Sequence, residues 1–335
     1  MKAFVTLPRN TTFDTFFTPE NIALAERLGE IVWNETDRHL TPEEIAARIG
    51  DCDTYITGWG SPRLDKTILD AAPNLRLLTH LCGTVVPFVS DEMWERGIRV
   101  LSGNRFFAES VAEGTLAYIL AALRDIPGYS RRLHDTRQWK KSTDYNQGLA
   151  GKRIGIISYG AIARHLVRIL SVFRVKLFVY DIAPLPAEDV ARYHLTQATL
   201  EEIFSTCDIV TVHTPLFDAT RHLIGRDLLS LLGEGTLFVN TSRGAVIDQA
   251  ALEDELATGR FRAVLDVYEQ EPPAQDCPLY DLPNVLMMPH MGGPTVDLRA
   301  FITETLLRES HGFLHENAPI PSEITRQMSL TMSRS

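Results

Sequence analysis

Short apolar segments alternate with amphipathic helical segments along most of this chain, and this alternation restricts the possible folds more than any other feature. The first series of strand candidates consists of AFVTL, GEIVWN, DTYITGW, LRLLTHL and IRVLSG. The second series consists of IGII, KLFVYD, DIVTVH, TLFVN, AVLDVY and VLMMPH. Because neighbouring parallel strands need a long crossover connection, usually a helix, the pattern predicts an α/β protein with two doubly wound parallel sheets.

The two series predict two domains, for which a chain of 335 residues is long enough. We expect the first domain to comprise residues 1–103 plus 293–335, because a helical segment at about 295–315 follows the second series and can return to the first sheet. The second domain then comprises residues 104–292. A ligand cleft is expected between the two domains.

Three other segments can be interpreted from their residue patterns. Apolar residues recur at helical spacing over 108–124, which predicts a long helix at the start of the second domain. The polar segment 131–148 that follows is expected to be an exposed crossing. The polar tail 329–335 is expected to be mobile.

The composition excludes several classes of partner and site. A formal net charge of −10 would repel a phosphate backbone, so nucleic-acid binding is not expected. The apolar run 116–123 is about a third of a membrane span, and no signal peptide is apparent, so we expect a cytoplasmic protein without a membrane segment. Widely spaced cysteines without a CxxC pair predict neither disulfides nor a metal site. They are Cys52, Cys82, Cys207 and Cys277.

A turn between a predicted strand and a predicted helix matches most of the GxGxxG/A fingerprint for dinucleotides. Ser158, Gly160 and Ala163 occupy its three positions. Gly160 lets the backbone approach a pyrophosphate closely, and the helix N-terminus behind it attracts phosphate. Ser158 departs from the pattern, because glycine makes the tight turn there at a lower conformational cost. By itself, the motif could also be an ordinary strand–turn–helix connection.

A carboxylate, Asp181, ends the next predicted strand. In dinucleotide-binding sheets such a carboxylate accepts hydrogen bonds from the ribose hydroxyls of NAD and repels the 2′-phosphate of NADP. The next residues are Ile182, Ala183 and Pro184, so no arginine is at hand to accept that phosphate. We therefore expect NAD, or NADH, to be preferred over NADP.

Chemically distinctive side chains follow three predicted strands of the second series. Arg243 lies in NTSRGAVID, Glu271 in LDVYEQEP and His290 in MPHMGGPT. The carboxyl ends of parallel strands meet at one edge of the sheet, so these residues can gather there. Arginine can hold a substrate carboxylate at two points, and histidine can transfer a proton near neutral pH. A carboxylate beside the histidine would orient it and favour its protonated form.

Each of the three residues also has a simpler interpretation. His290 follows a proline and could be a structural or surface histidine. Arg243 could be a solvated arginine in a turn, and Glu271 could be an exposed acid in a loop. The spacing alone does not decide between these alternatives.

The motifs, taken together and in order, resemble those of the D-isomer-specific 2-hydroxyacid dehydrogenases. They include LRLLTHLCGTVV, GKRIGIISYGAIAR, VTVHTPL, NTSRGAVID, LDVYEQEPP and LPNVLMMPHMGG, and the likeness covers almost the whole chain. The resemblance implies Rossmann/flavodoxin-like domains and NAD-dependent interconversion of a small 2-keto acid and a D-2-hydroxy acid. The family also implies a homodimer.

The resemblance implies roles for individual residues. Arg243 would hold the substrate, Glu271 would pair with the histidine, and His290 would be the general acid/base. The substrate loop would be Cys82, Gly83 and Thr84, whose N–H groups would help to grip the carboxylate. The cofactor would contact Tyr159, Gly160, Ala161, Ile162, Asp181, His213, Thr214, Pro215, Thr220, Thr241, Ser242, Arg243, Asp266, His290, Gly292 and Gly293. Asp266 in particular would meet the nicotinamide amide.

The chain departs from the family pattern at several points. Ser158 replaces the first fingerprint glycine, and Phe217 stands where threonine is common. The CGTVV loop lacks the second glycine and the acid of the common GVGVD form, and Gly114 stands where histidine is frequent. These departures leave the substrate contacts open.

Other functions on this fold remain as alternatives. A corepressor or NAD(H)-sensing scaffold could keep the site and act through partner binding. Formate dehydrogenase is disfavoured because that relative carries glutamine where Glu271 stands. We expect no added regulatory domain after about residue 316, and the first-domain loop has no basic cluster that would mark a phosphate pocket. An unphosphorylated substrate is therefore expected.

Overall fold

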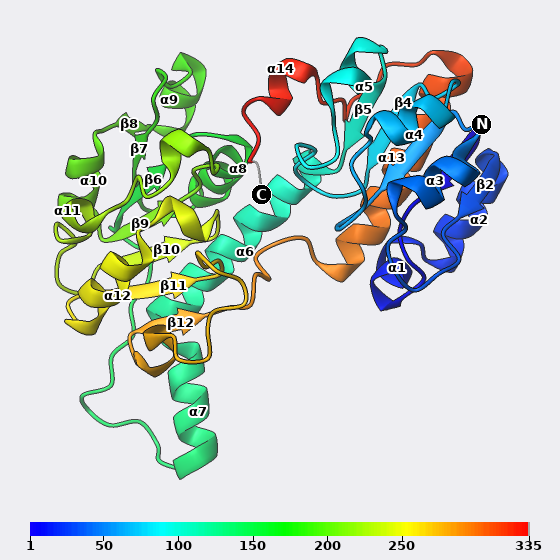
Figure 1. Ribbon diagram of the computed structural model, residues 1–335. Coiled ribbons are helices and arrows are strands. Elements are labelled where there is room, and N and C mark those ends of the chain that lie inside the picture. The colour runs from blue at the N-terminus through cyan, green and yellow to red at the C-terminus, as the bar shows by residue number, and fades with distance from the viewer. Residues whose placement is uncertain (334–335) are drawn as a thin grey trace. The chain divides into compact units, whose positions relative to one another are not determined.

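The computed structural model describes residues 1–333 and divides into two compact units (Figure 1). The first unit contains Met1–Phe107 together with the chain from Pro294 onward, so it is discontinuous. The second unit contains Ala108–Gly293. Each unit is built around one parallel sheet, which confirms the predicted α/β class with two doubly wound sheets.

The sheet of the first unit has five parallel strands in the order β2-β1-β3-β4-β5. They are β1 (Lys2–Val5), β2 (Glu30–Trp33), β3 (Thr54–Thr57), β4 (Leu77–His80) and β5 (Arg99–Ser102). Side chains alternate between the two faces of a strand, so Ala3 and Val5 enter one hydrophobic cluster while Phe4 enters another. Both faces of the sheet are therefore covered.

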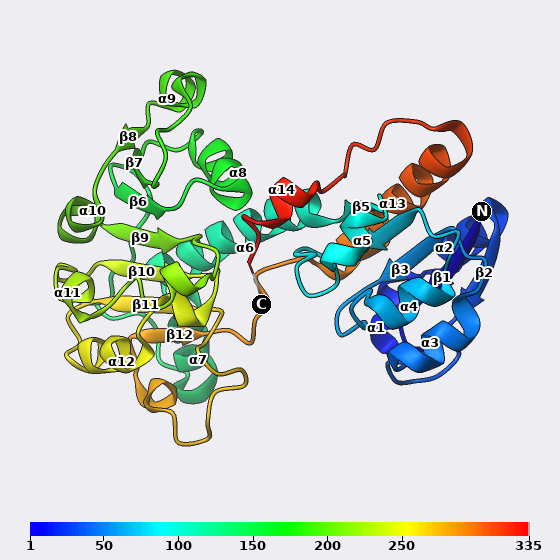
Figure 2. The same cartoon turned by 45° about the horizontal axis from the view of Figure 1, so that its top comes forward.

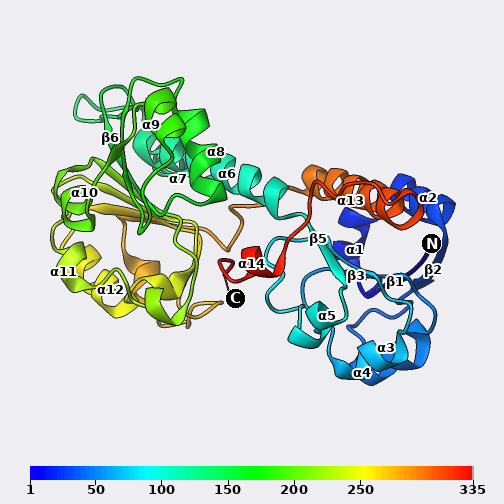
Figure 3. The ribbon, with the colours of Figure 1, turned by 90° about the horizontal axis from the view of Figure 1, so that it is seen from above.

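Helices form a layer on each face of the first sheet (Figure 3). One layer contains α1 (Thr11–Phe16), α2 (Pro19–Leu28) and α13 (Val296–Glu316). The other contains α3 (Pro42–Ile49), α4 (Lys66–Ala71) and α5 (Asp91–Glu95). At the start of α3, Thr41 and Glu44 cap each other's backbone N–H groups, and Pro42 occupies the first turn. These contacts fix the start of the helix.

The sheet of the second unit has seven parallel strands in the order β12-β11-β10-β9-β6-β7-β8. They are β6 (Arg153–Ile157), β7 (Lys176–Tyr180), β8 (Thr196–Gln197), β9 (Ile209–Val212), β10 (Leu237–Asn240), β11 (Arg262–Leu265) and β12 (Val285–Met287). Figure 2 shows β9 to β12 side by side. The sequence did not predict β8, because two exposed residues at a sheet edge carry no periodicity.

Hydrophobic clusters also cover both faces of the second sheet. Ile156 and Val239 pack into one cluster, whereas Ile157 and Phe238 pack into the other. The helices of this unit are α6 (Asn104–Arg124, which begins in the first unit), α7 (Ile126–Thr136), α8 (Ala161–Leu170), α9 (Ala187–Tyr193), α10 (Leu200–Thr206), α11 (Arg226–Leu229) and α12 (Gln249–Ala257). Short 3-10 turns lie at Asp218–Thr220, Gly244–Val246 and Pro278–Asp281.

Two expectations about irregular segments were partly wrong. Residues 131–136 belong to helix α7, although none of the residues of α7 is buried, as expected of an exposed crossing. The tail contacts the first unit through α14 (Arg326–Ser329), and Thr84 donates a hydrogen bond to the carbonyl of Ser333. Met332 packs against a core cluster. The tail is therefore held by specific contacts as far as Ser333, and residues 334–335 lie outside the described part of the chain.

Within residues 1–333, one helix, α6, is long and apolar enough to cross a membrane by length and composition alone. Core helices of globular domains pass the same test. In α6, Ala112, Ile119 and Leu123 enter the hydrophobic cluster of the second unit. Part of this apolar helix is thus packed inside that unit.

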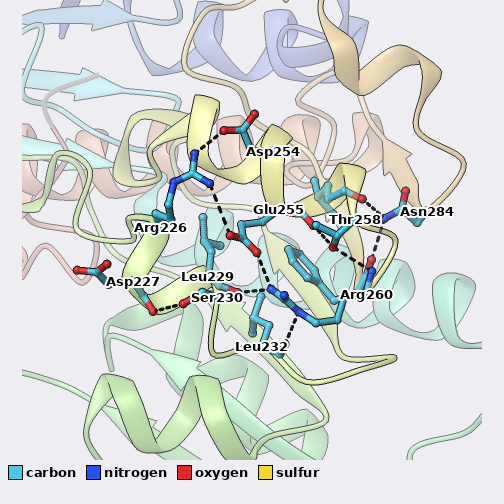
Figure 4. A network of polar contacts seen from close by, with 12 residues as sticks. Arg226, Asp227, Leu229, Ser230, Leu232, Asp254, Glu255, Thr258, Arg260 and Asn284 are labelled. Atoms are coloured by element: carbon cyan, nitrogen blue, oxygen red, sulfur yellow. Dashed lines mark hydrogen bonds and ion pairs between the residues drawn. The ribbon is translucent and has the colours of Figure 1, made fainter.

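An ionic network joins elements at the amino ends of the strands of the second sheet (Figure 4). Glu255 on α12 bonds Arg260 at 2.6 Å, and it also lies 3.6 Å from Arg226 on α11. Arg260 donates to the carbonyls of Leu229 and Leu232 in the connection that leads to β10. Glu255 is mostly buried, so removing one partner would leave an uncompensated charge. This network holds the edge of the sheet opposite to the strand ends described next.

Candidate active site

The strand order of the second sheet reverses between β6 and β9, which are neighbours although β7 and β8 lie between them in sequence. In open parallel sheets, such a reversal creates a ligand site at the carboxyl ends of the strands. The loops after β6, β9, β10, β11 and β12 all emerge at this edge. They carry the polar residues that were singled out from the sequence.

A histidine and a carboxylate form a direct pair at this edge. Nδ1 of His290, in the loop after β12, lies 2.7 Å from Oε2 of Glu271, in the loop after β11. The other carboxylate oxygen of Glu271 accepts a hydrogen bond from the backbone N–H of Tyr268 at 3.1 Å. Since a carboxylate only accepts hydrogen bonds, Nδ1 must carry a proton. Nε2 remains for another partner, and the imidazole side chain is 52% exposed.

The loop that carries His290 is fixed by Asp266, which is almost fully buried. One carboxylate oxygen accepts the N–H of Met291 at 2.7 Å, and the other accepts the N–H of Gly292 at 2.8 Å. His290 itself adopts a left-handed backbone with φ of 54°, which is uncommon for a residue with a side chain. Asp266 thus holds the strained turn that presents the imidazole.

Arg243 follows β10 and is half-buried in the same unit. Its Nη1 donates to the carbonyl of Ser242 at 2.7 Å, and the side chain of Asn240 donates to the carbonyl of Arg243. Burial lowers the pKa of Arg243 from its ordinary value, whereas the negative charge of Glu271 acts in the opposite direction. The guanidinium is thus near enough to Glu271 to interact with it electrostatically. Arg243, Glu271 and His290 therefore share one neighbourhood.

Two glycines allow the close backbone contacts on which this arrangement depends. A Cβ atom at Gly244 would lie 1.8 Å from the backbone carbon of Tyr268, which is impossible without moving the loop that leads to Glu271. A Cβ atom at Gly114, on α6, would lie 2.4 Å from the carbonyl oxygen of Gly292. Gly114 therefore lets α6 pack directly against the loop after His290. The sequence marked Gly114 only as a departure from the family pattern.

The predicted dinucleotide turn lies between β6 and α8. Ser158 has a φ of 74°, so it adopts the left-handed conformation that glycine would adopt more easily. Its hydroxyl lies 2.8 Å from the hydroxyl of Thr214, in the loop after β9. Gly160 caps α8 without a side-chain hydrogen bond, and a Cβ atom there would meet nothing within 4 Å. The backbone thus faces open space at an uncapped helix N-terminus, which fits a pyrophosphate.

Asp181 follows β7 beside this turn. Its two carboxylate oxygens accept the N–H of Tyr159 at 2.7 Å and the N–H of Ala183 at 2.9 Å. Each oxygen has a second lone pair that can still accept a ribose hydroxyl. Together with Gly160, this carboxylate fits a nicotinamide dinucleotide.

The other residues predicted to meet the cofactor make mostly internal bonds. Thr220 donates to the carbonyl of Pro215, and Thr241 bonds Thr115 on α6 at 2.9 Å. His213 is buried, and burial lowers its pKa to about 4, so it is neutral. Ala161 and Ile162 open α8, while Gly293 packs against α6. These groups shape the loops at the carboxyl edge.

Comparison with known proteins identifies the family. The model of the D-isomer specific 2-hydroxyacid dehydrogenase, NAD binding domain, matches residues 116–292, which is more than half of the chain. The chain belongs to the D-isomer specific 2-hydroxyacid dehydrogenase family. The resemblance inferred from the sequence motifs is thereby confirmed, and a nicotinamide dinucleotide is the cofactor class of the family's NAD-binding domain.

Relatives of this chain include two curated enzymes. D-3-phosphoglycerate dehydrogenase of Methanocaldococcus jannaschii is 31% identical over 303 residues, which is 88% of this chain but only 56% of that protein. Hydroxypyruvate reductase of Thermotoga maritima is 30% identical over 265 residues, covering 78% of this chain and 85% of that protein. A crystal structure of a phosphoglycerate oxidoreductase from Rhizobium etli superimposes with a TM-score of 0.78 at 25% identity, covering 97% and 99% of the two chains.

The predicted substrate loop lies in the first unit, after β4. The side chain of Cys82 is buried, so only its backbone could meet a ligand. The carbonyls of Cys82 and Gly83 accept hydrogen bonds from the hydroxyl of Ser102, while the hydroxyl of Thr84 is bound to Ser333. The fixed carbonyls restrict the loop and leave its N–H groups as the candidates for holding a substrate.

Proposed function

We propose that this dehydrogenase reduces a small 2-keto acid to the D-2-hydroxy acid, and catalyses the reverse oxidation, with Arg243, Glu271 and His290 as its working residues. The observation that carries the proposal is the 2.7 Å contact between Nδ1 of His290 and Oε2 of Glu271, with Arg243 in the same neighbourhood. It is the arrangement that a proton donor beside a carboxylate-binding group requires.

The roles of the three side chains follow from their chemistry. A reduced nicotinamide, when bound, supplies the hydride for the carbonyl carbon. Nε2 of His290 donates a proton to the carbonyl oxygen, while Glu271 keeps the imidazole oriented through Nδ1 and stabilises its charged form. Arg243 binds the substrate carboxylate and stabilises negative charge that develops on the oxygen. In the first unit, the N–H groups of Cys82, Gly83 and Thr84 are the proposed substrate-binding groups.

NADH is the proposed cofactor in preference to NADPH. Asp181 offers a negative charge to the adenosine ribose, which attracts its hydroxyls and repels a 2′-phosphate. Asp266, besides holding the turn at His290, would accept a hydrogen bond from the nicotinamide amide. The remaining contacts would come from the loops at Tyr159–Ile162, His213–Pro215, Thr220, Thr241–Ser242 and Gly292–Gly293.

The substrate class is proposed from the relatives and from the charge of the first-unit loop. The curated relatives are named as phosphoglycerate and hydroxypyruvate enzymes, and both names describe acids with an oxygen function at carbon 2. The loop 82–85 itself contains no basic side chain, so an unphosphorylated 2-keto acid is the proposed substrate. The relatives described here are dehydrogenases and reductases and give no support to the corepressor alternative.

A homodimer in the cytoplasm is proposed as the working form. None of the residues of α7 is buried within the chain, and large apolar side chains on α7 and the loop after it are exposed. They are Ile126, Leu133, Trp139 and Tyr145. A second copy would cover them, so Leu133→Arg should convert a dimer into monomers in analytical ultracentrifugation. The four unpaired cysteines support a reducing compartment.

The decisive experiment is a spectroscopic assay of NADH consumption with a panel of 2-keto acids. Glyoxylate, pyruvate, hydroxypyruvate and longer homologues should separate into substrates and non-substrates. Arg243→Ala should lower kcat/KM by about 100-fold or more, because a charged two-point contact is lost. Near-normal turnover by this variant, or no turnover of any acid by the unaltered protein, would refute the proposal.

A further inference from the structure

The first sheet also reverses its strand order, and side chains with no role so far gather at that point. In the order β2-β1-β3-β4-β5 the reversal lies between β1 and β3. The general rule for open parallel sheets places ligands at the carboxyl ends of such a pair of strands. Trp59 follows β3, α1 follows β1, and Arg299 on α13 reaches both.

The loop that carries Trp59 is rigid and presents a large aromatic ring. Ser61 accepts the N–H of Gly58 at 2.9 Å and bonds the hydroxyl of Thr6, at the end of β1, at 2.7 Å. Gly60 has a φ of 74°, a conformation that favours glycine. Trp59 nevertheless remains 43% exposed. The loop thus holds the indole in a fixed position beside the guanidinium of Arg299.

Arg299 holds a positive charge that the described chain does not neutralise. Its Nη1 donates to the hydroxyl of Thr15 at 3.3 Å, and its Cζ lies 5.0 Å from the ring centroid of Trp59 and 5.8 Å from that of Phe16. Within residues 1–333 it forms no ion pair with a carboxylate, and its Nε is buried without a hydrogen-bond partner.

The position of Arg299 in its helix is also energetically unfavourable. It lies near the first turn of α13, where the helix dipole disfavours a cation. A half-buried guanidinium with an unsatisfied N–H, an unfavourable helix position and no counter-ion is destabilising. An anionic ligand would supply the missing counter-ion.

Both residues adjoin the loop that we propose to hold the substrate. Burial raises the pKa of the Cys82 thiol, and the backbone of Trp59 and the charge of Arg299 act in the opposite direction. Phe107 joins this group to the loop: its ring centroid lies 6.1 Å from that of Trp59, and a Cβ atom at Gly83 would lie 3.3 Å from its ring. A molecule held by the N–H groups of Cys82–Thr84 would have its far end near Trp59 and Arg299.

We propose that Arg299 and Trp59 form a second anion site in the first unit, and that the substrate is a 2-keto acid with a second carboxylate at its far end. This inference rests on the proposed function. A single guanidinium matches one carboxylate in charge and in the spacing of two parallel hydrogen bonds, whereas a phosphate dianion would leave a charge unpaired. The rings of Trp59 and Phe16 hold the guanidinium in place, and the exposed ring of Trp59 would border the carbon chain.

The test compares two five-carbon acids that differ only at the far end. 2-Oxoglutarate carries a carboxylate there, and 2-oxovalerate carries a methyl group. The unaltered enzyme should prefer 2-oxoglutarate by about tenfold or more in kcat/KM, since a hydrogen-bonded ion pair is gained. Arg299→Met, which keeps the stem packed against the rings, should lower kcat/KM for 2-oxoglutarate by about 10- to 100-fold and leave 2-oxovalerate almost unchanged.

The controls separate this site from structural effects. Arg308→Met removes a guanidinium of the same helix, one that is paired with Glu304 at 2.9 Å. This variant should leave kcat/KM unchanged for both acids. Arg299→Lys should recover part of the preference. An equal loss for both acids in Arg299→Met, or a preference for 2-oxovalerate, would overturn the proposal, and so would a preference for 3-phosphohydroxypyruvate over 2-oxoglutarate.

A binding measurement distinguishes failure of this inference from failure of the proposed function. Calorimetry with 2-oxoglutarate and 2-oxovalerate reports on the site even if no acid is reduced. Binding of 2-oxoglutarate that is lost in Arg299→Met, without turnover, would support the anion site and refute the reductase. Turnover of 2-keto acids together with equal binding of the two probes would support the reductase and refute the anion site.

Discussion

At the scale of single residues, the pair formed by His290 and Glu271 can be tested against a second pair whose carboxylate lies in the same loop as Glu271. His222 lies 2.8 Å from Glu269, which is on the surface and only two residues from Glu271 in sequence. Glu271→Gln keeps an acceptor for Nδ1 of His290 but removes the negative charge that stabilises the charged imidazole.

We expect Glu271→Gln to lower kcat by about 10- to 100-fold and to shift the pH–rate profile of ketone reduction to lower pH. Steady-state assays from pH 5 to pH 9 would measure both effects. Glu269→Gln should leave the rate and the profile unchanged. If the two variants behave alike, the His290–Glu271 contact has no special role in catalysis.

The proposed preference for NADH over NADPH can also be tested at a single carboxylate. Asp181→Asn keeps one acceptor oxygen beside the turn at Gly160 and removes the charge. The ratio of kcat/KM for NADH to that for NADPH should fall by about tenfold or more, because repulsion of the 2′-phosphate is lost. Tryptophan or NADH fluorescence titrations would check the same change in binding. An unaltered ratio would show that another group selects the cofactor.

Candidate site residues could be predicted from the sequence where they belong to a recurring motif. Residues whose role depends on close contact between distant segments could not. Arg243, Glu271 and His290 each follow a strand, so their convergence at one sheet edge could be predicted. The contact of Gly114 with Gly292 could not, because it joins a helix to a loop far away in sequence. For the same reason, the motifs gave no indication that Asp266 fixes the turn at His290.

At the scale of elements, α6 supports the active-site loop through the missing side chain of Gly114. Gly114→Ala would place a methyl group 2.4 Å from the carbonyl oxygen of Gly292, so the helix or the loop must move. We expect a loss of about 1–3 kcal/mol in the free energy of unfolding and a lower kcat. Chemical denaturation and steady-state kinetics would measure these effects.

The control for this prediction is Gly148→Ala. A Cβ atom at Gly148 has only one neighbour within 4 Å, the end of the Arg124 side chain at 3.8 Å, so the methyl group fits. This variant should match the unaltered protein in stability and rate. Full activity in Gly114→Ala would mean that α6 can shift without disturbing His290.

Elements with strong periodicity could be predicted from the sequence, and those without it could not. The eleven apolar segments all became strands of the two parallel sheets. The edge strand β8 has two exposed residues, and α7 has no buried residue, so neither shows a hydrophobic pattern. The tail is held by the Thr84–Ser333 hydrogen bond and the packing of Met332, and local sequence cannot reveal such contacts.

At the scale of the whole molecule, buried histidines should make stability depend on pH. Burial lowers the pKa of His80, in the first unit, to about 3 and that of His213, in the second unit, to about 4. In the unfolded chain both would titrate near 6.5. Below that pH the unfolded state binds more protons than the folded state, so the free energy of unfolding must fall as the pH decreases.

Between about pH 6 and pH 4, each histidine should reduce stability by up to about 1.4 kcal/mol per pH unit. Urea denaturation at several pH values would show the slope. His80→Gln should flatten it for the first unit and His213→Gln for the second, whereas exchange of the exposed His134 should not. A slope that is unaffected by either buried exchange would contradict this account.

The ionic network around Glu255 lies at the amino ends of the strands, and the chemistry lies at their carboxyl ends. Substitutions that strengthen or weaken the contacts of Arg226, Glu255 or Arg260 therefore change the thermal stability of the sheet. They do not alter the groups that contact a ligand. Descendants of this chain could adapt to a hotter or colder habitat at one edge while acquiring a new substrate at the other. Selection can thus act on durability and on chemistry as nearly independent traits.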